Sequence, residues 1–347
     1  MASIYDLVTA KNVATYWTEL NENEQPYLGE TLFPTQKQLG TDLEWIKGAS
    51  NQPVGIKLSS YDAKAIRRDM EGIEKVQTEM PFFKESIYVD EKLRQQLNNF
   101  IDANKPQIVD TIMTKIFDRL TSLIRSTGVT LERMRMEMLT TGTITLSSNG
   151  QSYTYDYEVP ASQKITVSKS WSDPSADIIG DIQSYIDTMK AKGVKITRAV
   201  CNSTVLKNMV TNTAMKNAIY VFAGGTVNLT QDVVRSYIEA QTGIRIATYD
   251  NVWVDESKQV HKYIPDNTIV FMPDGTLGYT NIGTTPEESD LLNNLNARVS
   301  IVNEGVAITT TQMVDPVNVD TKVSMVALPS FEEADKIVIV DTEVTSG

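Results

Sequence analysis

The most regular hydrophobic pattern in the chain lies between Lys105 and Gly142. Apolar residues recur there at steps of three and four, interrupted only at Thr127, and the pattern repeats every eleven residues. Because eleven residues make very nearly three turns of a straight helix, the stripe predicts a helical rod about 54 Å long. Pro106 suits its first turn and Gly142 suits the position just past its end. The stripe consists of Val109, Ile112, Ile116, Leu120, Leu123, Leu131, Met134 and Met138.

The segment Ser126-Thr127-Gly128 is the weak point of this rod. Glycine in a helix interior costs roughly 1 kcal/mol relative to alanine. Two interpretations remain open: two helices that meet at a turn near Gly128, or one helix with a bending point there. In the second interpretation, Gly128 is the candidate hinge.

Weaker patterns precede the rod. Residues 5–20 have apolar positions at helical spacing and predict a short amphipathic helix. Residues 27–34 are apolar without either periodicity, which predicts an extended arm that packs on another surface. Residues 41–79 alternate in two stretches and predict a long two-stranded ribbon with a basic tip. Because such a ribbon is marginally stable alone, we expect a neighbouring subunit to hold it.

The basic tip of the ribbon is the candidate subunit interface. Its cations should meet acidic residues on a neighbour, because the rest of the chain is strongly acidic and such pairs determine how partners align. The alternative is a face that is merely solvated. The residues concerned are Lys64, Arg67, Arg68 and Lys75.

The pattern on either side of the rod is that of a compact mixed domain. Residues 82–89 alternate and predict a strand. Asp90 is well placed to cap a following helix. After the rod, Asn149-Gly150 predicts the turn of a β-hairpin over residues 143–157.

From residue 176 onward, helices and strands alternate and indicate a second α/β domain. The strands that follow Ala297, including Lys336 to Val340, should return to the first domain, because the hairpin still needs partners there. Helices are expected at 176–192, 203–211 and 230–242, and strands at 194–200, 244–249, 252–254 and 268–272.

Composition narrows the class of protein. The chain has 347 residues, is 41% hydrophobic, and can bury a sizeable core in two or more domains. Its 32 basic and 44 acidic residues give a net charge of −12, which argues against nucleic acid as a directly bound partner. No apolar run approaches the roughly 20 residues needed to span a bilayer. The N-terminus lacks the pattern of a signal peptide, and the single cysteine excludes an internal disulfide, so we expect an intracellular product.

Motifs that carry chemistry are missing from the sequence. It contains no phosphate-binding loop, no dinucleotide fingerprint, no H-E-x-x-H and no C-x-x-C. His261 is expected at the solvated edge of a hairpin, and a Cys201–His261 nucleophile pair has no supporting motif. The methionines around Met134 and Met138 suit adaptable packing better than metal binding. We therefore predict no catalytic residue, no cofactor and no metal site, and hence no enzyme.

Three stretches resemble parts of one protein family. Residues 27–34 followed by 42–48 resemble an arm that leads into an extended loop, residues 105–142 resemble a spine helix, and residues 263–270 followed by Gly278-Tyr279 resemble part of an axial domain. On these stretches the chain resembles the major capsid proteins of tailed bacteriophages, with the Hong Kong 97-like fold, and in particular the phage lambda type, the capsid protein E family.

The resemblance implies an α+β protein with five parts. In relatives the arm and the extended loop reach over neighbouring subunits, and the spine helix bends in the precursor shell and straightens in the mature one. A bending point at Gly128 would serve that change. The implied parts are an N-terminal arm (1–40), an extended loop (41–80), a peripheral domain with the spine helix (81–175), an axial domain (176–297) and return strands to the peripheral domain (298–347).

The implied function is that of a major capsid protein. Hexamers and pentamers of the chain would form an icosahedral shell around double-stranded DNA, without sequence-specific binding and without a membrane. Assembly would take place in the host cytoplasm with a separate scaffolding protein, and the product would be the virion; contacts with portal and decoration proteins stay open. We predict no covalent cross-link. The alternative is an encapsulin-like nanocompartment shell protein of the same fold.

Overall fold

The computed structural model describes residues 4–21, 25–47, 74–103, 105–148, 150–220, 228–292, 298–314 and 317–344. The chain divides into two compact units, and each unit draws on separate parts of the sequence. Unit 1 takes Met1–Glu44, Gln77–Glu132 and Tyr279–Ser330, and unit 2 takes Trp45–Val76, Arg133–Gly278 and Phe331–Gly347.

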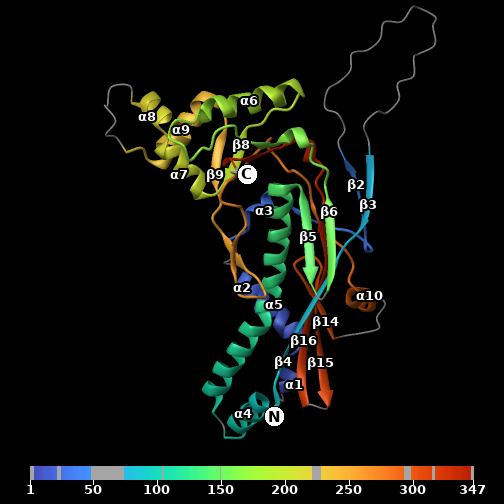
Figure 1. The fold of residues 1–347 in the computed structure, drawn as a ribbon. Helices are drawn as coiled ribbons and strands as arrows, with labels where there is room; N and C mark the ends of the chain where they lie inside the picture. Colours follow the sequence, from blue (N-terminus) through green and yellow to red (C-terminus); the bar gives the residue numbers. More distant parts are fainter. Residues whose placement is uncertain are drawn as a thin grey trace, which may run out of the picture. The chain divides into compact units, whose positions relative to one another are not determined.

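Unit 1 is built on a six-stranded sheet (Figure 1). Its central strand β16 pairs with β15, β13 and β4, all antiparallel, while β14 pairs with β15 at one end of the sheet and β1 joins β13 in parallel. The alternating apolar residues of β15 and β16 form one wall of the core. The strands are β1 (Thr35–Lys37), β4 (Phe82–Val89), β13 (Thr280–Ile282), β14 (Val299–Val302), β15 (Val306–Val314) and β16 (Val317–Pro329).

The N-terminal helices of unit 1 cover part of this core. The predicted amphipathic helix is confirmed: α1 is followed by α2, which buries Val13 and Trp17. The predicted extended arm at residues 27–34 is wrong in its central part, because α3 forms a short helix there that buries Leu32. Asp90 caps α4 as predicted, and its carboxylate accepts from Leu93 N at 2.7 Å. The helices are α1 (Ile4–Leu7), α2 (Ala10–Asn21), α3 (Leu28–Leu32), α4 (Glu91–Asp102) and α10 (Pro286–Leu292).

The predicted rod is helix α5, which runs without interruption over the 36 residues Pro106–Thr141. The interpretation as two helices with a turn near Gly128 is therefore wrong. Gly142 follows the helix at φ +77°, a left-handed conformation that glycine adopts without steric cost. The predicted stripe is buried from Ile116 to Met138 except at Thr127 and is half-buried at its N-terminal end. The boundary between the two units falls within α5, after Glu132.

Unit 2 contains a five-stranded sheet in the order β7-β17-β12-β8-β9. Helices α6 to α9 pack against it, and Figure 1 shows them around β8 and β9. Its core gathers Trp171, Ile182, Met189, Ile238 and Phe271. Helix α9 begins after the Thr230 cap and ends at Gly243 in the left-handed conformation, as capping rules predict. The strands are β7 (Lys164–Thr166), β8 (Arg198–Cys201), β9 (Arg245–Thr248), β12 (Thr268–Met272) and β17 (Val338–Asp341), and the helices are α6 (Ile178–Ala191), α7 (Ser203–Thr211), α8 (Thr213–Ile219) and α9 (Gln231–Thr242).

The final strands divide between the two sheets. Strands β14 to β16 join β4, as expected for strands that return to the first domain. The same expectation is wrong for Lys336 to Val340, because β17 lies between β7 and β12 in the sheet of unit 2. A strand as apolar as β17 is stable only where both its faces are covered, and the centre of this sheet provides such cover.

Three two-stranded pieces complete the described fold. The predicted hairpin is confirmed as β5 and β6, which pair only with each other among the described strands. Strands β2 and β3 pair within the range predicted for the extended loop, and residues 48–73 of that range lie outside the described part. The pieces are β2 (Asp42–Lys47) with β3 (Glu74–Glu79), β5 (Thr143–Ser148) with β6 (Gln151–Asp156), and β10 (Val252–Val254) with β11 (Val260–Lys262).

Candidate assembly surfaces

The base of the extended loop is held in unit 1 by two glutamates at the start of α10. Lys37 on β1 lies 2.6 Å from Glu288 and donates to the Gly283 carbonyl at 3.0 Å. Glu287 accepts from Lys322 Nζ at 2.5 Å and from Ser324 Oγ at 2.8 Å, both on β16. Helix α10 therefore ties the strand that leads into the loop to the central strand of the sheet.

The pKa of Glu287 is lowered by its hydrogen-bond donors in spite of its burial. Burial alone would raise the pKa of its carboxyl, but the hydrogen bonds from Lys322 and Ser324 favour the charged form and hold the pKa below its ordinary value. The carboxylate is thus ionised near neutral pH and can receive both donors.

Close backbone packing at the loop base requires glycine at position 283. A Cβ atom added to Gly283 would lie 2.6 Å from the carbonyl oxygen of Gly40 and 2.8 Å from a methyl group of Val326. The Gly40 oxygen also accepts from Thr284 N at 3.0 Å, so the turn before β2 is bonded directly to this segment. Rigid backbone contacts therefore hold the turn before β2 against the segment around Gly283.

The N-terminal arm packs on the part of α5 that belongs to unit 1. The buried Glu132 accepts from the Gly29 backbone N at 3.0 Å, and the ring of Tyr27 lies beside Gly128. A Cβ atom on Gly128 would lie 3.5 Å from the Tyr27 ring, an ordinary van der Waals contact. Alanine would therefore fit at position 128.

Hydroxyl side chains bond back onto the helix carbonyls around the candidate hinge. Ser126 Oγ donates to the Ser122 carbonyl at 2.9 Å, Thr127 Oγ1 to Ile124 at 2.7 Å, and Thr130 Oγ1 to Ser126 at 3.0 Å. Such bonds compete with the helix ladder and often bend helices. This stretch of α5 is regular, and its side chains favour bending.

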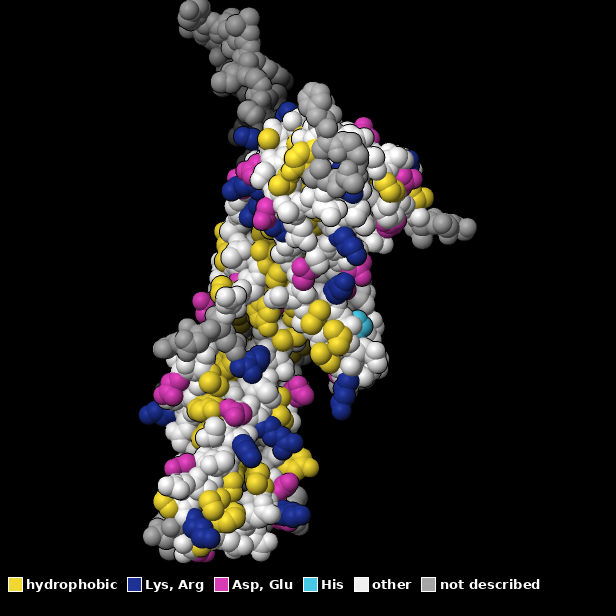
Figure 2. Space-filling model, turned by 90° about the vertical axis from the view of Figure 1, so that its left-hand side faces the viewer, with side chains coloured by type: hydrophobic (Ala, Val, Ile, Leu, Met, Phe, Trp, Pro, Cys, Tyr) yellow, Lys and Arg dark blue, Asp and Glu magenta, His cyan; other side chains and the backbone are white. Residues whose placement is uncertain are grey.

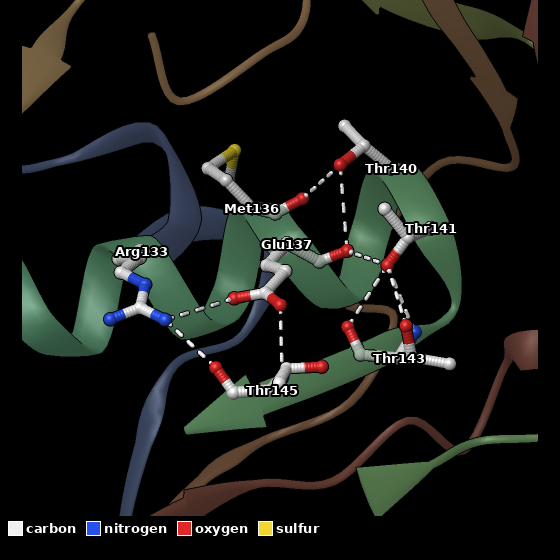
Figure 3. A network of polar contacts seen from close by, with 7 residues as sticks. All are labelled: Arg133, Met136, Glu137, Thr140, Thr141, Thr143 and Thr145. Carbon is white, nitrogen blue, oxygen red and sulfur yellow. Dashed lines mark hydrogen bonds and ion pairs between the residues drawn. The ribbon is translucent and has the colours of Figure 1, made fainter. Parts of the chain in front are cut away.

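The C-terminal turns of α5 are bonded to β5 within unit 2 (Figure 3). Arg133 Nη2 donates to the Thr145 carbonyl at 2.8 Å, and Glu137 accepts from Thr145 N at 2.9 Å. The two side chains also lie 3.6 Å apart, and Thr141 Oγ1 accepts from Thr143 N where the chain turns from helix to strand. These contacts align the hairpin with the helix.

Arg133 also supports the ribbon formed by β10 and β11. Its guanidinium lies 5.0 Å from the centre of the Trp253 ring. Trp253 stacks on its cross-strand partner His261, with ring centres 4.6 Å apart, and His261 Nε2 lies 2.8 Å from a carboxylate oxygen of Asp255. The hydrogen bond from His261 lowers the pKa of Asp255.

The opposite side of this ribbon carries exposed apolar side chains. Because side chains alternate along a strand, Val252, Val254 and Val260 point away from Trp253 and His261. They are 51%, 56% and 65% exposed. Figure 2 shows hydrophobic side chains next to the single histidine of the chain. We call these three residues the valine face.

The predicted basic cluster falls mostly outside the described residues. Lys64, Arg67 and Arg68 lie there, and Lys75 belongs to β3 although its side chain is not described. The cluster therefore stays a prediction. The sequence-based reasoning missed the valine face, whose signal was the pair of alternating stretches Val252-Trp253-Val254 and Val260-His261-Lys262.

The two residues considered as a nucleophile pair have other roles. Cys201 is buried in β8, where desolvation raises the pKa of its thiol to about 12, so it carries almost no thiolate near neutral pH. His261 packs on Trp253 and bonds to Asp255. Each side chain therefore has a structural role in its own strand, and these contacts do not involve the other.

Within the described residues, no group of three or more His, Cys, Asp or Glu side chains is arranged to hold a metal ion. In the same part of the chain, no helix has the length and apolar character needed to cross a bilayer.

Comparison with solved structures places the fold. The chain is similar to a protein described as a prophage capsid protein of Escherichia coli CFT073, with 12% identity, a TM-score of 0.60, and 96% of this chain and 99% of the other covered. It is also similar to a phage-related protein from Bordetella bronchiseptica RB50, with 10% identity, a TM-score of 0.56, and coverage of 96% and 97%. The fold is thus the Hong Kong 97-like capsid fold.

Comparison with protein families is more specific. No curated protein sequence matches the chain. The family model described as phage major capsid protein E matches residues 9–342, which include most of both units, helix α5 and the strands of both sheets. The chain therefore belongs to the phage major capsid protein E family.

Proposed function

We propose that this chain is the major capsid protein of a tailed phage or prophage, and that its copies form an icosahedral shell around double-stranded DNA. The observation that carries the proposal is the family match over residues 9–342, because it covers nearly the whole chain. A fold similar to that of a prophage capsid protein over 96% of the chain supports it.

The chemistry of the single cysteine supports an architectural role. Cys201 is buried, and desolvation raises the pKa of its thiol to about 12, so it is a poor nucleophile near neutral pH. Tight binding to DNA phosphates requires clustered basic residues, whereas this chain has a net charge of −12. The charge therefore favours a shell that encloses DNA without sequence-specific binding.

The remaining expectations concern assembly. Hexamers and pentamers would form with a separate scaffolding protein in the host cytoplasm, and the extended loop with Lys64, Arg67, Arg68 and Lys75 would contact a neighbouring subunit. Helix α5 would bend near Gly128 in the precursor shell. The glycine itself, a poor helix former, supports that last proposal. The back-bonded hydroxyls beside it also occur elsewhere in α5, as at Thr111, Thr114 and Thr121, and do not by themselves single out this stretch.

Expression of the chain together with the neighbouring genes of its source genome tests the function. We expect closed icosahedral shells by electron microscopy, and nuclease-protected double-stranded DNA in particles from the complete set of genes. Shells that contain a specific protein cargo in place of DNA would instead indicate a nanocompartment. Subunits that never assemble with any neighbouring gene product would contradict the proposal.

A further inference from the structure

We propose that the valine face of the β10–β11 ribbon is a contact surface for a second copy of this chain. The inference rests on the proposed function, because it names one surface by which shell subunits meet. Val252, Val254 and Val260 are each more than half exposed, although valine prefers the interior. They lie side by side on two paired strands, with Val254 directly opposite Val260.

The ribbon that carries the valine face is already ordered in the single subunit. An isolated two-stranded ribbon is marginally stable in water. Here its other side is held by the stack of Arg133, Trp253 and His261, and His261 is held by Asp255. A partner that covers the valine face therefore does not have to order it first, which reduces the entropy lost on contact.

Charge favours another copy of this chain as the partner. Residues 252–262 contain two acidic residues, Asp255 and Glu256, and two basic residues, Lys258 and Lys262, so the ribbon is neutral when His261 is neutral. The whole chain carries −12, and two copies therefore repel each other at most orientations. On the valine face itself, Lys262 lies opposite Val252 and is paired with Asp266. A second copy can therefore approach this face at a low electrostatic cost.

Two substitutions at one position test the contact. Val254→Glu places a charge on the valine face, and Val254→Thr keeps the shape and the strand preference but adds a hydroxyl. Val344→Glu is the matched control, because Val344 is also in unit 2 and is 45% exposed. We expect at least tenfold fewer shells for Val254→Glu, a smaller loss for Val254→Thr, and wild-type yield for Val344→Glu. All three unassembled subunits should keep the wild-type unfolding midpoint.

Hydrogen exchange separates this inference from the proposed function. As subunits associate, amides in residues 252–262 should exchange at least tenfold more slowly than in dilute subunits, whether the product is a closed shell or a smaller oligomer. Protection in small oligomers, without shells, would support the contact and contradict the shell function. Wild-type shells with unprotected amides here, or a wild-type shell yield for Val254→Glu, would overturn the contact and leave the function standing.

Discussion

At the scale of single residues, Glu287 shows how one partly buried carboxylate can bind a short helix to the central strand of a sheet. It receives Lys322 and Ser324 from the central strand, while the adjacent Glu288 receives Lys37 from the strand before the loop. The two neighbouring glutamates therefore connect segments that are far apart in the sequence. Both ion pairs are partly shielded from water, which limits their screening by salt.

Glu287→Gln should destabilise the protein in a pH-dependent way. The pKa of Glu287 is lowered in the folded state, so its stabilising effect is complete above the ordinary value of 4.5 and is lost as the pH falls through the folded pKa. At pH 7 we expect a loss of roughly 1–3 kcal/mol in the free energy of unfolding, which denaturant titration measures.

The difference between Glu287→Gln and wild type should shrink as the pH is lowered from 4.5. Asp290→Asn makes the same acid-to-amide change at an exposed position of the same helix, so it is the control and should change the free energy of unfolding little. A constant difference between pH 7 and pH 3 would show that Glu287 acts through shape and not through charge.

At the scale of elements, α5 combines length with a local weakness. Its apolar stripe is buried over most of its length, yet three hydroxyls near Gly128 bond to the helix carbonyls. Gly128 is not among the residues with positive φ, and the space beside Tyr27 accepts a methyl group. The helix therefore retains a residue that is poor for helix stability at a position where alanine would fit.

Gly128→Ala should stabilise straight α5 by up to about 1 kcal/mol per subunit. Thermal unfolding of the unassembled subunit measures this change. Because every subunit of a shell carries the substitution, we also expect precursor shells to assemble less well or to expand under milder conditions. Gly283→Ala is the contrasting variant and should destabilise, since its added Cβ atom meets the Gly40 carbonyl oxygen. Gly128→Ala precursor shells with wild-type yield and expansion would show that the hinge lies elsewhere.

The predicted extended loop is the second element for which we make a prediction, and this prediction rests on charge. Reversing Arg67 and Arg68 to Glu should reduce the assembly yield several-fold at low salt and less at high salt, because exposed charges are screened over about 10 Å at 0.1 M salt. Light scattering at several salt concentrations measures this yield. A yield that stays at the wild-type level at every salt concentration would favour the alternative of a merely solvated face.

At the scale of the whole molecule, the N-terminal residues belong to the core of unit 1. Val13, Trp17, Leu32 and Phe33 are buried, Trp17 Nε1 donates to Asn303, and β1 pairs with β13. We expected this segment to be an arm that packs on another surface. Its described part packs instead on its own unit. Each of these buried side chains contributes about 1.5–3 kcal/mol.

Deletion of residues 1–40 should therefore unfold unit 1, because the lost burial approaches the total stability of a typical domain, about 5–15 kcal/mol. Trp17→Ala should cost roughly 3–5 kcal/mol, and the exposed Lys11→Ala on the same helix should change little. Circular dichroism and thermal unfolding report both effects. A truncated protein that unfolds at the wild-type midpoint would mean that these residues serve only contacts between subunits.

The sequence by itself determined the features that depend on neighbouring residues. The stripe of α5, the cap at Asp90 and the stop at Gly142 all follow from local periodicity and local backbone preference, and the structure confirms them. The hairpin around Gly150 belongs to the same class. The order of these parts was also enough to indicate the family.

Only the tertiary structure decided which distant segments meet. Residues 28–32 have no helical periodicity, and they form α3 where Glu132 accepts from Gly29 N and Leu32 is buried. β17 was expected with β14 to β16, but apolar alternation does not tell one sheet from another, and the open position was between β7 and β12. The valine face likewise depends on the tertiary structure. Alternate residues show that a strand has two sides but not which side is covered, and here Arg133 covers the side of the ribbon that carries Trp253.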